Sequence, residues 1–343
     1  MTAREYPVFT VTPKAERSLR AGHPWVYGEE VTAVEGAYQN GDMVDVVSNK
    51  GRYLGTGWVN DHSKIRVRII SRNANDTFDE AFFRRRVCYA LNYRKTVMGP
   101  VDYRCCRLIF GEADQFPGLT VDRFENILVT QVLSLGMERR KDWVYRALVE
   151  LLREDGEQID AIYERNDVTI RTLEGLEQGK GFYQMEGLRT DLSGHVTITE
   201  NGIKYDVDYI EGQKTGFFLD QKYNRQAAAK LARGRRVLDC FTHTGAFALN
   251  AAAAGAEHVT AVDVSAFALE LAAENGKRNG LTNLDYKCAD VFDLLTEMAK
   301  EKKCDYDYII LDPPAFTKAR RTVENAMRGY KEINYRAMKL LPR

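Results

Sequence analysis

The stretch YIILDPPAF, residues 308–316, places a carboxylate directly after an apolar run and follows it with two prolines and an aromatic ring. An apolar, β-rich run of this length predicts a strand that is covered on both faces. Proline cannot donate to a sheet ladder, so the strand must end at Asp312. This acid is therefore expected at the carboxyl end of a buried strand, the edge of an open α/β sheet where ligands bind.

Strand and helix patterns alternate from Arg236 onward. The four predicted strands are RVLDCF (236–241), HVTAVDV (258–264), LDYKC (284–288) and YDYIILD (306–312). Helical patterns of roughly ten or more residues separate and follow them, which predicts right-handed crossovers and a parallel sheet. The fold class expected for this part of the chain is therefore α/β.

Four acids end or follow these strands, namely Asp239, Asp263, Asp290 and Asp312. Carboxylates at one rim of a sheet repel one another when no ligand is bound, so stability alone would rarely place them there. Their regular placement is the main sequence evidence for a functional site.

The first turn, DCFTHTG (239–245), contains a single glycine, Gly245. A dinucleotide fingerprint needs three glycines, which argues against a nicotinamide-dependent dehydrogenase. Thr242 and Thr244 instead offer caps and polar contacts at a helix N-terminus. Asp263, about 20 residues further on, is placed to accept hydrogen bonds from both ribose hydroxyls. The pattern favours a nucleoside ligand without a pyrophosphate.

Two of the acids also have simpler interpretations. Asp290 could accept the amino group of adenine, with Val291 or Phe292 against the ring, or it could be the N-cap of the helix that follows. Asp239 could contact the ligand or only orient its own loop. The sequence leaves both pairs of alternatives open.

Composition limits the function classes. Lys plus Arg and Asp plus Glu both total 49, so a nucleic acid would have to be held by local basic patches. The chain lacks a long apolar run and an apolar signal-peptide core, so we expect a cytoplasmic protein that does not enter a membrane. Six scattered cysteines and five histidines predict neither a bound metal nor a disulfide framework.

Two domains are expected before the parallel sheet. Residues 1–72 carry short β-type runs split by glycines, which predicts a small barrel or sandwich. Residues 73–188 mix strands and helices as an α+β module. The last domain, residues 189–343, begins with two alternating runs around Asn201-Gly202, which predicts a hairpin.

Two basic clusters lie in these first domains. In KIRVRII (64–70), alternation places Lys64, Arg66 and Arg68 on one strand face, which is either a solvated face or a nucleic-acid backbone contact. The run Arg84–Arg86 is expected to form only the wet face of a helix.

The motifs VLDCFTHTGAFAL, VTAVDVS, CADVF and YIILDPPAF, taken in order, resemble those of class I S-adenosylmethionine-dependent methyltransferases. GHPWVYGEEV with GDMVDVVSNKGRYLGTGWVN looks like an N-terminal PUA domain. GEADQFPGLTVDRFEN is similar to the central domain of bacterial large-subunit ribosomal RNA methyltransferases that make 5-methylcytosine. The likeness spans nearly the whole chain and implies methyl transfer to a base in 23S ribosomal RNA, with the PUA domain helping to bind RNA.

The resemblance also implies a fold and a set of cofactor residues. It implies a small β-barrel PUA domain, an α+β central domain and a Rossmann-like methyltransferase domain whose C-terminal strands are missing. It places Asp239, Phe241, Thr242, Thr244 and Gly245 at the methionine part of S-adenosylmethionine, Asp263 and Ser265 at the ribose, and Asp290 and Val291 at the adenine. The stretch EGQKTGFFLDQKYNR matches a loop of that family, which implies that Thr215, Gly216, Phe218, Asp220 and Gln221 cover the cofactor. Packing at a domain interface is the alternative for Phe217 and Phe218.

DPPAFTKARR (312–321) resembles the target-base loop of the same family. Asp312 would accept the amino group of an extruded base after Pro313 fixes the backbone, and Phe316 would offer a stacking face. Lys318, Arg320 and Arg321 would hold phosphates of the displaced strand.

Carbon 5 of cytosine is a poor nucleophile, and enzymes of this kind first add a cysteine thiolate to carbon 6. In the family, that cysteine comes from the strand after the one that ends at Asp312, so we expect the nucleophile to lie beyond residue 343 and this chain to lack it. Cys240, in the first strand, is expected to be an inert core residue.

An unpaired strand edge at YIILD predicts that the chain is a fragment of a longer protein or that a partner chain, as in a homodimer, covers the edge. Alternative functions are methylation of another base, such as guanine at nitrogen 7, and RNA binding without chemistry.

Overall fold

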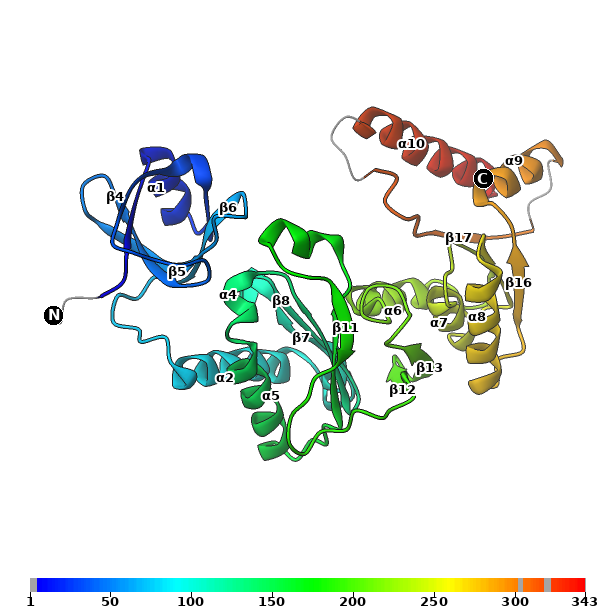
Figure 1. Cartoon of the computed structure of the whole chain (residues 1–343). Helices are drawn as coiled ribbons and strands as arrows, with labels where there is room; N and C mark the ends of the chain where they lie inside the picture. Colours follow the sequence, from blue (N-terminus) through cyan, green and yellow to red (C-terminus); the bar gives the residue numbers. More distant parts are fainter. Residues whose placement is uncertain (1–4, 302–304, 318–321, 343) are drawn as a thin grey trace. The chain divides into compact units, whose positions relative to one another are not determined.

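The computed structural model describes residues 5–301, 305–317 and 322–342, which form two compact units. One unit comprises the described residues of 1–196 and 208–217, and the other comprises those of 197–207 and 218–343. Figure 1 shows the elements of both units in sequence colours.

The first unit begins with a sheet whose strand order is β2-β6-β5-β4-β1-β3. Its elements are β1 (Val8–Val11), α1 (Pro13–Arg20), β2 (Trp25–Tyr27), η1 (Gly28–Glu30), β3 (Val31–Glu35), β4 (Met43–Ser48), β5 (Tyr53–Val59) and β6 (Ile65–Ser71). Thr12 caps α1 through its side chain, which accepts a hydrogen bond from the backbone N–H of Ala15. The sheet and α1 pack around a core that includes Phe9, Val44 and Val67, all fully buried.

The same unit continues with a second sheet, in the order β11-β10-β9-β8-β7, which is flanked by helices. Its elements are α2 (Glu80–Val97), α3 (Pro100–Tyr103), β7 (Cys105–Phe110), η2 (Gly111–Asp114), β8 (Leu119–Phe124), β9 (Ile127–Val132), α4 (Leu135–Glu138), α5 (Lys141–Glu154), β10 (Ala161–Asn166), η3 (Thr169–Glu174) and β11 (Gly179–Phe182). Phe82 and Phe83 of α2 share one core with Val144 and Leu148 of α5 and with sheet residues such as Val121. This arrangement is the α+β module that the sequence predicts.

A hairpin of β12 (His195–Glu200) and β13 (Ile203–Asp208) precedes the parallel sheet, as predicted from Asn201-Gly202. Asn201 and Gly202 have φ values of 54° and 80°. Two consecutive positive φ angles are what a two-residue type I′ turn requires.

The second unit is built on strands β14 (Arg236–Cys240), β15 (His258–Asp263), β16 (Leu284–Cys288) and β17 (Tyr308–Leu311). All of them pair in parallel, and their order across the described sheet is β16-β15-β14-β17. The helices of this unit are η4 (Leu219–Gln221), α6 (Lys222–Lys230), α7 (Ala246–Ala253), α8 (Ala266–Arg278), α9 (Val291–Glu301) and α10 (Val323–Leu340). The predicted parallel α/β sheet is confirmed.

Both faces of this sheet are covered. On one face Val237 and Ala261 pack with the alanines of α7, and on the other Leu238 and Val262 pack with residues of α9 and α10, including Ile333. Alternate residues along a strand point to opposite faces, so a strand buried on both sides is almost wholly apolar. An acid at its end is therefore an exception that needs a separate reason.

Among the described helices, none combines the length and the apolar character needed to cross a membrane.

Candidate functional site

The carboxyl ends of the parallel strands meet at one edge of the sheet, and the predicted acids lie there. Asp239 is the most deeply buried of these acids, with 1% of its surface exposed. Burial, together with the negative charges of Asp312 and Asp263, raises the pKa of Asp239 to about 7. These charges act on Asp239 because the three carboxylates share one edge.

The two oxygens of Asp239 have different surroundings. Its Oδ2 accepts hydrogen bonds from the Thr242 hydroxyl at 2.5 Å and from the Ala248 backbone N–H at 2.9 Å. Its Oδ1 is buried and has no hydrogen-bond partner among the described residues. Oδ2 therefore orients the loop, which is one of the two interpretations that the sequence left open for Asp239. Oδ1 remains available to a ligand. Buried polar atoms are rarely left without a partner, so an unpaired one marks a place where a ligand fits.

The turn after β14 has an unusual backbone. Phe241, His243 and Gly245 have positive φ angles of 64°, 54° and 82°. Non-glycine residues with such angles carry strain and concentrate at functional sites. At Gly245, an added Cβ would lie 2.9 Å from Cβ of Ala272, so this position also needs glycine for space.

The predicted cap by Thr242 is wrong. The N-cap of α7 is Gly245, which has no side chain to cap the helix, and the Thr242 hydroxyl donates to Asp239 instead. Asp239 is deeply buried and needs hydrogen-bond donors. The Thr242 hydroxyl therefore donates to Asp239, although the local sequence pattern alone would predict that it caps the helix. Thr244 is partly exposed in the same turn.

Asp263 connects this turn to the end of β15. Its Oδ2 accepts a hydrogen bond from the backbone N–H of His243, and its Oδ1 accepts one from the backbone N–H of Ser265, both at 2.9 Å. Each carboxylate oxygen can accept a further hydrogen bond, so both remain competent to accept one from a ribose hydroxyl. The Ser265 hydroxyl caps α8 by accepting from the N–H of Ala268 at 3.2 Å.

Asp290 is exposed at the start of α9, and the N-cap alternative is confirmed for its Oδ1. This oxygen accepts hydrogen bonds from the backbone N–H groups of Phe292 at 2.8 Å and Asp293 at 3.1 Å. The Val291 side chain is 2% exposed and belongs to the core under α9 and α10. An adenine ring could therefore meet the backbone of Val291 but not its side chain.

Two neighbours of the predicted residues were not singled out from the sequence. Val264, directly after Asp263, is 73% exposed, which is unusual for an apolar residue and suits the face of a nucleobase. The ring of His243 lies 5.4 Å from that of Phe218, and burial lowers its pKa, so the imidazole is neutral near pH 7. The position of Val264 after the ribose acid was the available signal, whereas nothing local marked His243.

The predicted covering loop is divided between the two units. Thr215 is fully buried in the first unit and donates to Asp122 at 2.6 Å, and Gly216 of the same unit has a φ of 123°. Phe217 is also buried, at 5% exposure. The Thr215 hydroxyl is thus already engaged within its own unit.

The rest of the loop belongs to the second unit. The carbonyl of Phe218 accepts a hydrogen bond from Arg225 at 2.8 Å, which fixes the start of the segment. Asp220 is exposed in η4, and Gln221 accepts a hydrogen bond from Asn224 at 2.8 Å. These side chains lie on or near the surface, where they could meet a ligand.

At the end of β17, Asp312 is exposed, Pro313 is partly exposed, and Phe316 is partly buried. The Phe316 ring lies 4.4 Å from that of Tyr330 on α10, with an angle of 34° between the planes, and 5.7 Å from that of Phe292. Its ring is thus already packed by α10 and α9. Lys318, Arg320 and Arg321 lie outside the described residues.

The predicted RNA-binding strand face is divided in the structure. Lys64 is exposed, whereas Arg66 donates to Asp61 at 2.7 Å and to Tyr38 at 3.0 Å. Arg68 is 9% exposed and forms ion pairs with Glu174 at 2.8 Å and Glu112 at 3.3 Å. These contacts favour a structural role for Arg68 and leave Lys64 as the member of the three that faces solvent.

Among the described cysteines, Cys240 lies beside the end of β17, where it is opposite Leu311. Cys240 is fully buried, and burial raises the pKa of its thiol, as expected of an inert core residue. Cys288 is exposed at the end of β16, but β15 and β14 separate that strand from β17. At about 4.8 Å per strand, the two ends are roughly 14 Å apart.

Two parts of the chain match known family models. Residues 9–72 match the model of a PUA-like domain family, and residues 183–342 match that of an S-adenosylmethionine-dependent methyltransferase family. The chain is 42% identical to the ribosomal RNA large subunit methyltransferase I of Photobacterium profundum over 329 residues, which is 95% of this chain and 80% of that protein. It is 43% identical to the protein of the same name from Shewanella denitrificans over 333 residues, with 96% and 81% covered.

Two solved structures show the same fold. A candidate S-adenosylmethionine-dependent methyltransferase from Streptococcus mutans superposes with a TM-score of 0.78 at 22% identity, covering 98% of this chain and 83% of its own. A candidate methyltransferase complexed with SAH superposes with a TM-score of 0.76 at 23% identity, covering 95% and 82%.

Proposed function

This chain belongs to the family of ribosomal RNA large subunit methyltransferase I, and from that premise we propose that it methylates a base of 23S ribosomal RNA. The proposed target atom is carbon 5 of cytosine. S-adenosylmethionine is the cofactor of its C-terminal domain, and it supplies an electrophilic methyl group on a sulfonium centre.

The observation that carries the proposal is the unpaired buried oxygen of Asp239 beside the strained turn 241–245. A carboxylate in that position suits the ammonium group of the cofactor's methionine part. Asp263 would accept hydrogen bonds from the ribose hydroxyls, and Asp290 with the backbone of Val291 would meet the adenine. The remaining proposed contacts are Phe241, Thr242, Thr244, Gly245 and Ser265, with Thr215, Gly216, Phe218, Asp220 and Gln221 from the preceding loop.

We propose that the exposed carboxylate of Asp312 accepts the amino group of an extruded base, with Pro313 fixing the backbone and Phe316 beside the ring. Phe316 is braced by Tyr330, which would hold the ring in place for this contact. Lys64, Arg66, Lys318, Arg320 and Arg321 are the proposed phosphate contacts. For Arg68 its buried ion pairs favour a structural role.

One observation favours a second candidate. Attack on a methyl group by carbon 5 of cytosine needs a thiolate at carbon 6, but Cys240, the described cysteine beside the end of β17, is fully buried and its thiol pKa is raised. Nitrogen 7 of guanine carries its own lone pair and needs no such thiolate. Methylation at that atom is therefore the alternative, and RNA binding without methyl transfer is the third outcome.

One experiment separates these functions. The protein is incubated with 23S ribosomal RNA from unmodified transcripts and with cofactor labelled on its methyl group, and the labelled nucleotide is mapped. We expect label on a cytosine, and label on a guanine would establish the alternative. RNA binding with no label in the RNA would contradict an enzymatic role for this chain.

Two proposals about partners and location accompany this function. We propose a cytoplasmic protein, because that is where a bacterial ribosomal RNA is found. We also propose a homodimer paired at β17, because β17 is the apolar one of the two edge strands of the described sheet. Light scattering coupled to gel filtration tests the second, since a monomeric mass would contradict it.

A further inference from the structure

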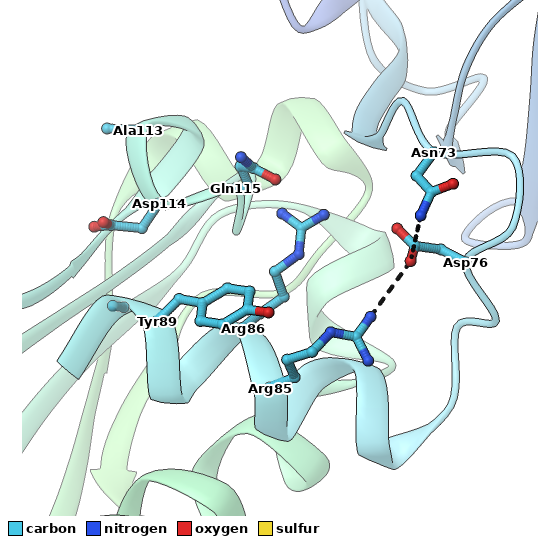
Figure 2. A pocket seen from close by; sticks show the side chains of 9 residues that line it. Asn73, Asp76, Arg85, Arg86, Tyr89, Ala113, Asp114 and Gln115 are labelled. Carbon is cyan, nitrogen blue, oxygen red and sulfur yellow. Dashed lines mark hydrogen bonds and ion pairs between the residues drawn. The ribbon is translucent and has the colours of Figure 1, made fainter. Parts of the chain in front are cut away.

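A polar cavity of about 410 Å³ lies in the first unit, whereas the proposed cofactor site belongs to the second. It lies between α2, the loop before that helix, and the end of η2 with Gln115. Figure 2 shows Arg85, Arg86 and Tyr89 projecting from α2, with Asn73 and Asp76 on one side and Gln115 on the other. Its volume is within the range of sites for small ligands.

The cavity is lined by two acids and two arginines, and Arg94, which does not line it but pairs with one of the acids, adds one positive charge. Asp76 is paired with Arg85 at 3.3 Å, and Asp114 receives two hydrogen bonds from Arg94, at 3.0 and 2.5 Å. Both carboxylates are therefore neutralised by these two guanidinium groups. Arg86 is left as the excess positive charge.

Arg86 makes no ion pair or hydrogen bond with any described residue, although it is partly buried. Its guanidinium lies 4.8 Å from the centroid of the Phe82 ring, which fixes its direction. Burial lowers its pKa, and a bound anion would offset that effect. The sequence predicted only a wet helix face here, but Arg86 is partly covered and lacks a protein partner.

The groups around Arg86 suit the rest of a nucleotide. Tyr89 is 60% exposed, which leaves a ring face open to a base. Gln115 brings an amide to the cavity and has a φ of 63°, a backbone conformation in which a non-glycine residue is uncommon. An amide both donates and accepts hydrogen bonds and so can pair with the edge of a base.

We infer that this cavity binds one nucleotide of a single-stranded RNA segment, with a phosphate at Arg86 and the base on Tyr89. Single-stranded RNA is recognised through unstacked bases on aromatic rings and through phosphate contacts. The inference rests on the proposed function, since it names a second place where the substrate RNA is held. It assigns to α2 a role in RNA binding that is separate from the methyltransferase domain.

The test measures binding of a fluorescein-labelled single-stranded RNA of about ten nucleotides, by anisotropy over a range of salt concentrations. We expect Arg86→Gln to weaken binding about tenfold and to reduce the slope of log Kd against log salt by about 0.7, the contribution of one phosphate contact on a single strand. The matched control is Arg84→Gln on the same helix. Arg84 is paired with Glu150 and Glu154 and does not line the cavity.

The aromatic contact has its own matched pair. Tyr89→Ala is expected to weaken binding about five- to 150-fold, the range for loss of one stacked base. Tyr93→Ala removes a ring of nearly equal exposure, 58%, from the same helix but outside the cavity, and should bind RNA as the wild type does.

The results distinguish this inference from the proposed function. Equal losses in Arg86→Gln and Arg84→Gln, or in Tyr89→Ala and Tyr93→Ala, would overturn the cavity assignment while leaving methyl transfer untouched. Uridine 5′-monophosphate that binds tightly to the wild type, with no change of RNA affinity in Arg86→Gln, would assign the cavity to free nucleotides instead. A wild type that binds this short RNA but transfers no label to the 23S ribosomal RNA transcript would reject the proposed function alone.

Discussion

The second unit contains two buried acids, Glu200 at the end of β12 and Asp239 near the end of β14. They differ in the hydrogen-bond and charge partners that surround them. Glu200 is fully buried and receives two hydrogen bonds from Arg225, at 2.7 and 3.0 Å. Asp239 is buried to nearly the same degree, but it pairs with no cation among the described residues, and one of its oxygens lacks any described partner. A structural acid is paired within the protein, whereas an acid held for a ligand keeps an oxygen free.

The largest effect is expected from removing the cation of the paired acid. Arg225→Gln leaves Glu200 charged and buried without a counterion, which costs about 3 to 5 kcal/mol of the free energy of unfolding. Urea denaturation measures this loss. Arg84→Gln, which breaks exposed ion pairs, should cost less than about 1 kcal/mol, and equal losses in both variants would remove the contrast between the two acids.

The unpaired acid should instead make stability depend on pH. The pKa of Asp239 in the folded protein, about 7, lies above its ordinary value of 3.8, so the folded state holds this proton more tightly than the unfolded chain does. Its contribution is therefore complete below about pH 4 and is lost as the pH rises through 7. Over that window the loss approaches about 4 kcal/mol, since each pH unit corresponds to about 1.36 kcal/mol.

Asp239→Asn supplies the control for this effect, because the amide can still accept from Thr242 and Ala248 but does not titrate in this range. The difference in unfolding free energy between the wild type and this variant should change steadily between about pH 4 and pH 7 and level off above that. A constant difference would show that Asp239 does not titrate as proposed.

Asp263 offers a test of the ribose assignment. Asp263→Ala should weaken binding of S-adenosylhomocysteine by about 2 to 4 kcal/mol, which is about 1 to 2 kcal/mol for each of two hydrogen bonds. Titration calorimetry measures it. Asp285→Ala, on the neighbouring strand β16, removes an exposed acid that pairs with His258 and should leave the affinity unchanged.

The smallest effect is expected at Asp290. Asp290→Ala removes the N-cap of α9 and should cost about 1 kcal/mol of stability. Asp290→Asn retains a capping oxygen and should restore most of that loss. A failure of Asn to rescue would indicate that the charge, and not the cap, matters at this position.

Local sequence patterns predicted the parts of the fold that depend on local physics. The buried strands, the turn at Asn201-Gly202 and the N-cap alternative for Asp290 all follow from periodicity and side-chain chemistry within a few residues. The common edge of the acids followed from the parallel connections. These features need no knowledge of distant contacts.

Other features depend on contacts that no local pattern contains. The Thr242 hydroxyl donates to the carboxylate of Asp239 and does not cap the helix, because the buried carboxylate competes for this donor. Strand alternation places Arg68 on the same face as Lys64 and Arg66. Arg68 is nevertheless buried, because it pairs with Glu174, more than a hundred residues away in the chain. The positive φ angles of Phe241 and His243 likewise arise from the packing of the turn and not from glycine.

The central claim is that the unpaired oxygen of Asp239 meets the ammonium group of the cofactor, and proton-linked binding tests it most directly. S-adenosylhomocysteine is titrated into the wild type and Asp239→Asn near pH 7 in buffers of different ionisation enthalpy. The ammonium group should lower the pKa of Asp239, so the wild type should release a proton on binding and its affinity should rise between pH 6 and pH 8. Asp239→Asn should bind more weakly and release none, whereas equal affinity and equal proton release in the two proteins would contradict the account.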